Sequence, residues 1–131
     1  MKYIGIMSGT SLDGIDAVIC EFTDDDQVQL IAKCSLPFEP ELQADLQKLL
    51  REFNLHLREF GELEVRLASN YATAVNKLLD LGQIPANEII AIGCHGQTVY
   101  HDPYNQYPFS LQLVDGNKLA QLTGIDVVCD F

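Results

Sequence analysis

Basic residues are scarce in this sequence. Its 131 residues include eight Lys and Arg against 19 Asp and Glu, which gives a formal net charge of -11. Nucleic-acid backbones and anionic membrane surfaces are bound by basic patches, so this balance argues against both as partners. Long apolar runs are also missing, and no stretch reaches the length of a membrane span. Lys2 is followed almost at once by a polar loop, so no signal-peptide pattern is visible.

Cysteines at metal-binding spacing are missing as well. The four cysteines are Cys20, Cys34, Cys94 and Cys129. None of them forms the close pairs that ligate metals, and three lie in apolar strand patterns, so we expect buried free thiols. Free thiols suit a reducing cytoplasm. Hydrophobic residues make up 47% of the chain, which is enough to bury the core of one domain-sized unit.

A loop of small residues between two apolar segments is what the sequence does contain. We call residues 9–16 the Gly9 loop; they are Gly9, Thr10, Ser11, Leu12, Asp13, Gly14, Ile15 and Asp16. Glycines let a ligand approach the main chain closely, and loop amides can form an anion-binding nest. Two carboxylates beside such a nest would repel a bare phosphate. A divalent cation between Asp13 and Asp16 reconciles the two features.

The Gly9 loop matches neither of two common phosphate-binding motifs. No Gly-Lys-Ser/Thr follows it, as a Walker A sequence requires. The Rossmann fingerprint opens a helix, whereas the alternation of Ile15, Ala17 and Ile19 is typical of a strand. A β-hairpin with a polar, Gly-rich turn and no ligand explains the same pattern, and this alternative stays open.

The first half of the chain predicts three strands followed by two helices. Residues 3–7, 14–22 and 28–36 form an antiparallel meander, because their connections are too short for crossovers. The second connection is a predicted turn at residues 23–26. Apolar residues then recur at helical spacing over 42–53 and over 60–78. The expected cap of the second helix is Asn54, and the expected end is near Gly82.

The second half predicts a site at the end of a strand. Residues 89–93 are nearly all apolar, as in a parallel strand covered on both faces and reached by a right-handed crossover. Ligands bind beyond the carboxyl ends of such strands, where the sequence has Cys94, His95, Gly96, Gln97 and Thr98.

The last elements are a hairpin strand, a short helix and a terminal strand. Residues 109–114 should pair back on 97–101. Asp115 should cap a helix that ends at Gly124, and residues 125–131 should form the final strand.

Three segments resemble the family of anhydro-N-acetylmuramic acid kinases, within the sugar-kinase and actin superfamily. Residues 7–16, Met-Ser-Gly-Thr-Ser-Leu-Asp-Gly-Ile-Asp, resemble its opening signature. Residues 93–103 resemble its central segment, with Cys94 where the family usually has Ser. Residues 111–131 resemble the segment that leads to its catalytic strand. The resemblance implies a ribonuclease-H-like, actin-like ATPase domain of α/β class. We expect a mixed five-stranded sheet, with an antiparallel three-strand meander, parallel strands and helices on at least one face.

The resemblance also implies a reaction and roles for residues. The family uses ATP and water to convert 1,6-anhydro-N-acetylmuramic acid to N-acetylmuramic acid 6-phosphate in cell-wall recycling. All eight residues of the Gly9 loop would handle the ATP phosphates and Mg²⁺. His95, Gln97 and Thr98 would lie near the sugar, with His101 a weaker candidate. Met7 and Ser8 occupy the region where the superfamily often carries a metal-binding Asp, so we expect no direct metal ligand from the protein.

The resemblance covers the whole chain but well under half of a family member. In the family, the catalytic aspartate and a second lobe follow the segment that matches Asp130 and Phe131. We therefore expect the phosphate-loop lobe of a cytoplasmic kinase, truncated before its catalytic segment and inactive alone. Two alternatives stay open. One is a non-catalytic nucleotide-binding relative. The other is a module that self-associates through an uncovered terminal strand at Val127 and Val128.

Overall fold

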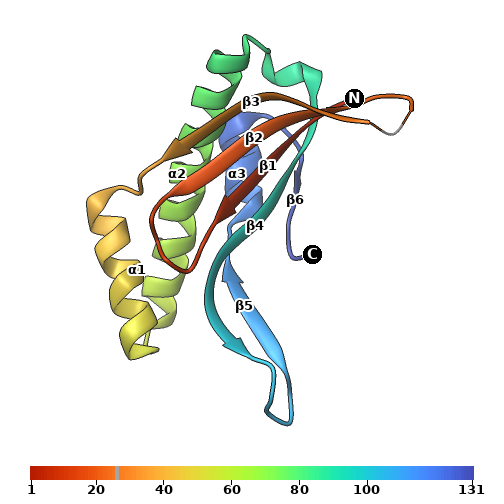
Figure 1. Cartoon of the computed structure of the whole chain (residues 1–131). Coiled ribbons are helices and arrows are strands. Elements are labelled where there is room, and N and C mark those ends of the chain that lie inside the picture. The colour runs from red at the N-terminus through yellow and green to blue at the C-terminus, as the bar shows by residue number, and fades with distance from the viewer. Residues whose placement is uncertain (26) are drawn as a thin grey trace.

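The structure is a computed structural model that describes residues 1–25 and 27–131, and it has the predicted order of elements (Figure 1). The first half contains β1 (Lys2–Ser8), β2 (Ile15–Phe22), β3 (Val28–Leu36), α1 (Pro40–Glu52) and α2 (Leu57–Gly82). The second half contains a 3-10 helix (Ala86–Glu88), β4 (Ile89–Asp102), β5 (Phe109–Leu113), α3 (Gly116–Thr123) and β6 (Val127–Val128). Asp26, the last residue of the predicted turn, lies outside the described residues.

The sheet is mixed, as predicted. Its strand order is β3-β2-β1-β4-β5, and β6 pairs with the first half of β4. The β1–β2 and β2–β3 pairs are antiparallel, which confirms the meander, and β1 and β4 are parallel, which confirms the crossover. The described strands number six instead of the predicted five. The reason is that β4 continues to Asp102 and pairs with β5, so the hairpin belongs to the same sheet.

Helices cover one face of this sheet. β1 and β2 turn Ile4, Ile6, Ile15, Ala17 and Ile19 toward the helices, and all five are at least 96% buried. The helices pack against these residues with apolar stripes at the predicted spacing. Their buried members are Leu42, Leu46 and Leu49 of α1, and Leu63, Leu67, Tyr71, Val75 and Leu78 of α2. These stripes fill the core between the two layers. Among the described residues, no helix combines the length and apolar composition needed to cross a membrane.

The helix boundaries follow local backbone chemistry. Phe53 adopts a left-handed conformation (φ 47°) and ends α1, so Asn54 lies in the link and is not the predicted cap. α2 begins after His56, whose backbone N–H donates to a carboxylate oxygen of Glu59 at 2.9 Å. The predicted cap of α3 is confirmed, because the Asp115 carboxylate accepts from the Lys118 N–H at 2.8 Å.

The end of the chain differs from the prediction. Only Val127 and Val128 form a strand where residues 125–131 were expected to do so. Asp130 is in the left-handed region (φ 59°), which turns the backbone out of the extended conformation. Phe131 consequently lies over the sheet face that the helices leave open. There its ring is 6.4 Å from that of His95 in an edge-on arrangement.

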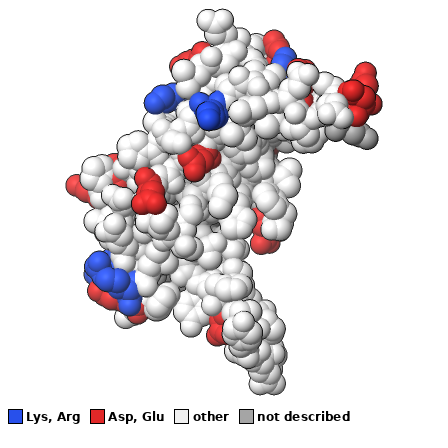
Figure 2. Space-filling view, in the orientation of Figure 1, with Lys and Arg blue, Asp and Glu red and all other residues white. Residues whose placement is uncertain are grey.

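Charged side chains are unevenly distributed over the surface. Figure 2 shows that acidic and basic groups are scattered over the upper and left parts of the visible face. The protruding β4–β5 hairpin at the bottom of the view is almost entirely uncharged (Figures 1 and 2). Residues 100–113 include one formal charge, on Asp102. This hairpin and the Gly9 loop are therefore two chemically different connections between antiparallel strands.

Candidate functional site

The Gly9 loop connects β1 to β2 and is anchored by one apolar side chain. The Leu12 N–H donates to the Gly9 carbonyl at 3.1 Å, which closes a tight turn. Leu12 is in the left-handed region (φ 57°), yet its side chain is only 2% exposed. A branched apolar residue rarely adopts this backbone conformation, so burial of its side chain must offset the strain. The loop is therefore held in one shape.

The polar side chains of the loop face solvent. Thr10, Ser11, Asp13 and Asp16 are all exposed. The Asp16 carboxylate accepts a hydrogen bond from the hydroxyl of Ser35 on β3. Within the described residues, the Thr10 and Asp13 amides have no hydrogen-bond acceptor. Exposed hydroxyls, free amides and carboxylates together form a surface that can meet a phosphate and a hydrated cation.

The two glycines of the loop have different roles. A Cβ at Gly14 would lie 2.6 Å from the Leu36 carbonyl oxygen, so the close approach of β3 requires glycine there. A Cβ at Gly9 would have the Ser11 hydroxyl oxygen as its nearest neighbour, at 3.6 Å, which is an ordinary contact. The packing of the protein therefore explains Gly14 but not Gly9. A glycine that packing does not require is compatible with close approach of a ligand to the main chain.

A buried hydroxyl pair fixes the end of β1 beneath the loop. The Ser8 hydroxyl and the Tyr71 phenol of α2 are 2.8 Å apart, and both side chains are buried. Burial raises the pKa of Tyr71 well above its ordinary value, so the phenol stays protonated. Removing one partner would leave the other polar group buried and unpaired, which costs about 1–3 kcal/mol. The pair therefore sets where the Gly9 loop begins.

Gln97 connects β4 to the loop from inside the protein. Its side-chain amide donates to the carbonyls of Gly9 and Thr98, both at 3.2 Å. The side chain is completely buried, and its own carbonyl oxygen has no partner among the described residues. An unpaired buried oxygen costs about 1–3 kcal/mol. Gln97 therefore acts on the loop backbone and is not open to direct contact with a sugar.

A distortion of β4 brings Gln97 inside. Gly96 has a φ of 79°, and a Cβ there would lie 2.7 Å from the Leu113 carbonyl oxygen. The β1–β4 register shifts at this point. A regular strand would turn His95 and Gln97 to the same face, whereas the bulge separates them. The predicted position of residues 94–98 beyond the strand end was wrong, because this bulge lets β4 continue.

His95 lies on the open face of the sheet. Together with Met7, Asp16 and Phe131 it lines an apolar hollow of about 430 Å³. The structure thus brings His95 and Asp16 to one hollow, although the sequence places them 79 residues apart. Thr98 lies further along β4, where its hydroxyl accepts from the Gln112 side chain at 3.3 Å.

His101 is separated from His95, the predicted sugar-site residue that lies beside the Gly9 loop. It pairs with Ser110 near the outer part of the β4–β5 hairpin. It follows His95 by six residues, so it lies roughly 20 Å further along the strand. The resemblance made His101 only a weaker candidate for the site, and His101 does not line the hollow that His95 and Asp16 share.

Cys94 belongs to the protein interior. Its side chain is fully buried, and burial raises the pKa of its thiol to about 11. All four cysteines are free, as predicted, but the other three are only half-buried. The Cys94 thiol is therefore a packing group below the site and not a nucleophile at neutral pH.

A bound Mg²⁺ would find few protein ligands here. Among residues 1–25 and 27–131, no three His, Cys, Asp or Glu side chains gather as a metal cluster. Asp13 and Asp16 are nevertheless exposed on the loop and can reach a hydrated ion through water. Mg²⁺ commonly keeps several waters and binds through one or two carboxylates plus substrate phosphates. The donor set fits that mode of binding.

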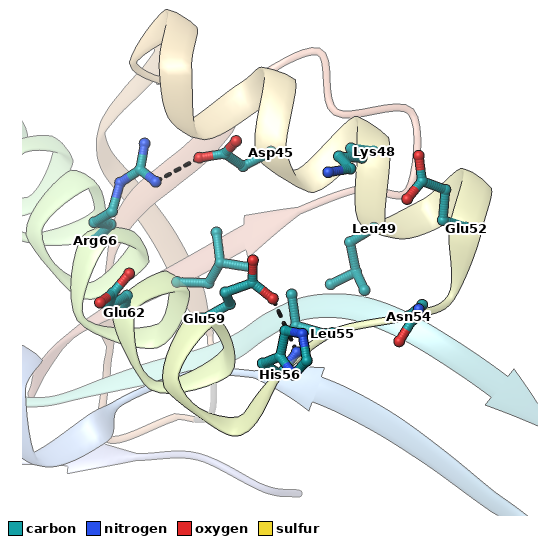
Figure 3. A pocket seen from close by; sticks show the side chains of 11 residues that line it. Asp45, Lys48, Leu49, Glu52, Asn54, Leu55, His56, Glu59, Glu62 and Arg66 are labelled. Carbon is teal, nitrogen blue, oxygen red and sulfur yellow. Dashed lines mark hydrogen bonds and ion pairs between the residues drawn. The ribbon is translucent and has the colours of Figure 1, made fainter.

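The polar pocket between α1 and α2 has a different character (Figure 3). It has a volume of about 310 Å³, and an ion pair between Arg66 and Asp45 at 2.6 Å spans its rim. Its charged residues have both signs and are already partly paired. None of the predicted site residues lines it, so we assign it no part in the site.

Two residues that support the loop have no sequence signal of this role. The sequence predicts Tyr71 only as a member of the apolar stripe over 60–78, and no pattern marks Gln43 of α1. The Gln43 side-chain amide donates to the Leu12 carbonyl at 2.9 Å. A lone glutamine on an amphipathic helix carries no local signal of such a role, since its partner is 31 residues away.

Comparison with known proteins gives a consistent result. A family model described as anhydro-N-acetylmuramic acid kinase matches residues 1–131. The chain belongs to this family. A protein named anhydro-N-acetylmuramic acid kinase from Aliivibrio fischeri is 47% identical over 130 residues, which is 99% of this chain and 35% of the relative.

Two further relatives carry the same name. The relative from Haemophilus influenzae is 46% identical, and the match covers 98% of this chain and 33% of the relative. The relative from Nitrosomonas europaea is 46% identical, and the match covers 100% of this chain and 36% of the relative. The chain thus spans about a third of the length of these relatives. Its mixed sheet with helices agrees with the actin-like ATPase fold implied by the resemblance.

Proposed function

We propose that residues 1–131 form the phosphate-loop lobe of a kinase acting on 1,6-anhydro-N-acetylmuramic acid. The observation that carries this proposal is the Gly9 loop, held rigidly from below and polar on its exposed side. Family membership supplies the reaction class. We place the catalytic aspartate and a second, adenine-binding lobe in the additional length that the relatives possess. Within this chain we assign no catalytic residue.

The proposed reaction uses water and ATP. Water adds across the 1,6-anhydro bond of the sugar, and the freed 6-oxygen takes the γ-phosphoryl group of ATP. The products are N-acetylmuramic acid 6-phosphate and ADP. Bound Mg²⁺ would neutralise charge on the phosphates. The chain's own contribution is positioning: loop amides and hydroxyls hold the phosphates, and Asp13 and Asp16 hold hydrated Mg²⁺.

For the sugar, we propose His95 and Thr98 as the nearest residues of this chain. The shared hollow of His95 and Asp16 supports this, because it places an imidazole beside the loop. Gln97 enters the proposal through its bond to the Gly9 carbonyl and not as a sugar ligand. His101 has no supporting contact and remains the weakest candidate. A cytoplasmic location is part of the proposal, and the free thiols support it.

Calorimetric titration of the 131-residue chain with Mg-ATP tests the loop. We expect weak binding with a dissociation constant of roughly 1 mM, about -4 kcal/mol, because phosphate contacts alone are exposed to solvent. Magnesium-free ATP should bind less tightly. A coupled assay of ADP release should show no sugar-dependent turnover by this chain and clear turnover by the complete enzyme. Turnover by the 131 residues alone would mean that a catalytic base lies among them.

Self-association is a second candidate property, and exposed apolar side chains favour it. Val128 is 55% exposed beside β4, and Phe131 is 73% exposed on the open face. We propose that two copies pair through the β6 edge. The net charge of -11 opposes this, but salt screens it beyond roughly 8 Å. Light scattering should show a larger particle as salt rises, and a strictly monomeric chain at high salt would contradict the pairing.

A further inference from the structure

Two glutamines from distant elements hold carbonyl oxygens of the Gly9 loop. Gln97 of β4 donates to the Gly9 carbonyl at 3.2 Å, and Gln43 of α1 donates to the Leu12 carbonyl at 2.9 Å. Neither residue belongs to the loop. Both bonds join side-chain donors to main-chain acceptors, so they restrict the orientation of particular peptide groups. At Gly9 the bond from Gln97 adds to the bond from the Leu12 N–H at 3.1 Å, which lies within the loop itself.

The orientation of a peptide group decides what it offers to an anion. In a trans peptide the C=O and the N–H of the next residue point in opposite directions. The described residues contain no cis peptide. Holding the Gly9 carbonyl inward therefore turns the Thr10 N–H outward, and holding the Leu12 carbonyl inward does the same for the Asp13 N–H. Thr10 and Asp13 are both exposed, and neither amide has an acceptor among the described residues.

The Gln97 side chain has a defined orientation. Both acceptors of its amide group are carbonyl oxygens, so reversing the amide would place oxygen against oxygen. Its own oxygen remains buried and unpaired. An apolar side chain of similar size would avoid this unpaired group. Stability alone therefore does not account for glutamine at this position, whereas a requirement to hold the loop carbonyl does.

We propose that Gln43 and Gln97 are positioning residues that orient the Thr10 and Asp13 amides toward a bound phosphate. This proposal rests on the proposed function, because it takes the ATP phosphates as the anion. The two residues act through the loop backbone and do not touch the ligand. Each glutamine controls one amide, so their effects should be separable by residue.

The test uses the 131-residue chain labelled with ¹⁵N and the substitutions Gln97→Met and Gln43→Met. The matched control is Gln29→Met. Gln29 is exposed on β3 and pairs with Glu21, at the end of the β2–β3 pair that lies away from the Gly9 loop. Backbone relaxation without ligand reports loop order. Titration with Mg-ATP then reports amide shifts and affinity.

Without ligand, Gln97→Met should increase mobility at Thr10, and Gln43→Met should increase it at Asp13. With Mg-ATP, each variant should bind about 10-fold more weakly and should lose the amide shift at its own residue. Gln29→Met should behave like the unsubstituted chain. The melting temperature of Gln97→Met should stay the same or rise, which separates positioning from a structural role.

The outcomes separate the two proposals. If the unsubstituted chain binds Mg-ATP and both methionine variants bind equally well, the glutamines do not position the loop and the proposed function stands. If the backbone mobility at Thr10 is unchanged in Gln97→Met, the positioning role is overturned, whatever the affinity of that variant for Mg-ATP. If the unsubstituted chain shows no amide shift at millimolar Mg-ATP, the phosphate-binding role of the loop fails, and the positioning proposal fails with it.

Discussion

The Gly9 loop and the tip of the β4–β5 hairpin are both polar connections between neighbouring antiparallel strands. In the first, Leu12 is buried and two glutamines bind the backbone. In the second, every residue from 103 to 111 is exposed, and Tyr104 is 96% exposed. The two connections differ in composition, and they differ also in their contacts with distant elements. The comparison shows that a polar turn becomes a site candidate when contacts from distant elements hold its backbone in place. A ligand binds best to hydrogen-bond donors that are already oriented.

The largest difference should appear when a large side chain is removed from each connection. Leu12→Ala deletes a buried side chain and should lower the free energy of unfolding by about 2–5 kcal/mol. Tyr104→Ala removes an exposed ring and should change it by less than about 0.5 kcal/mol. Urea denaturation monitored by circular dichroism measures both. Equal effects of the two substitutions would mean that the loop is no better anchored than the hairpin tip.

Carboxylates in the two connections should differ in their effect on catalysis. In the complete enzyme, Asp16→Asn should lower turnover on the order of 100-fold, because the loop loses charge beside the phosphates and metal. That is about 2.7 kcal/mol of transition-state stabilisation. Asp102→Asn in the hairpin should leave turnover within about 2-fold. Steady-state kinetics and melting curves together decide this, since a large loss of stability in Asp16→Asn would point to its bond with Ser35 instead.

The buried thiol beneath the loop should make stability depend on alkaline pH. The pKa of Cys94 is raised from 9.0 to about 11, so the native thiol stays protonated where the unfolded thiol ionises. Unfolding then releases a proton between pH 9 and pH 11, and stability falls as the pH rises through that window. The expected loss up to pH 11 is about 2 kcal/mol, and it should be negligible below about pH 8.

The replacement Cys94→Ser isolates this effect, because other alkaline groups titrate alike in both proteins. The variant should lose less stability than the unsubstituted chain between pH 8.5 and pH 11 in reducing buffer. Urea midpoints at both pH values provide the measurement. Parallel curves for the two proteins would show that the Cys94 thiol is not protected from ionisation.

The smallest effect should come from single hydroxyl groups. Tyr71→Phe leaves the buried Ser8 hydroxyl without its partner and should cost about 1–2 kcal/mol. Tyr107→Phe alters an exposed ring of the hairpin tip and should cost almost nothing. The Ser8→Ala, Tyr71→Phe double variant should be less destabilised than the sum of the two single variants, because both polar partners are gone. Additive losses would contradict a direct bond between the two hydroxyls.

The sequence by itself determined the elements and their faces. The alternation of Ile15, Ala17 and Ile19 predicted a half-buried strand, and the leucines of α1 predicted its buried stripe, because periodicity is local. Short connections predicted the meander. The Gly9 loop could also be found from sequence, since its small residues are contiguous and its signature is specific to the family.

Tertiary structure decided which residues support the loop. The bulge at Gly96 depends on the approach of the Leu113 carbonyl, so no local pattern could show that Gln97 turns inward and His95 outward. The contacts of Gln43 with Leu12 and of Tyr71 with Ser8 join residues 31 and 63 positions apart. A sequence pattern reports the burial of one segment. The pairing of polar atoms depends on where two segments meet, and only the folded chain sets that distance.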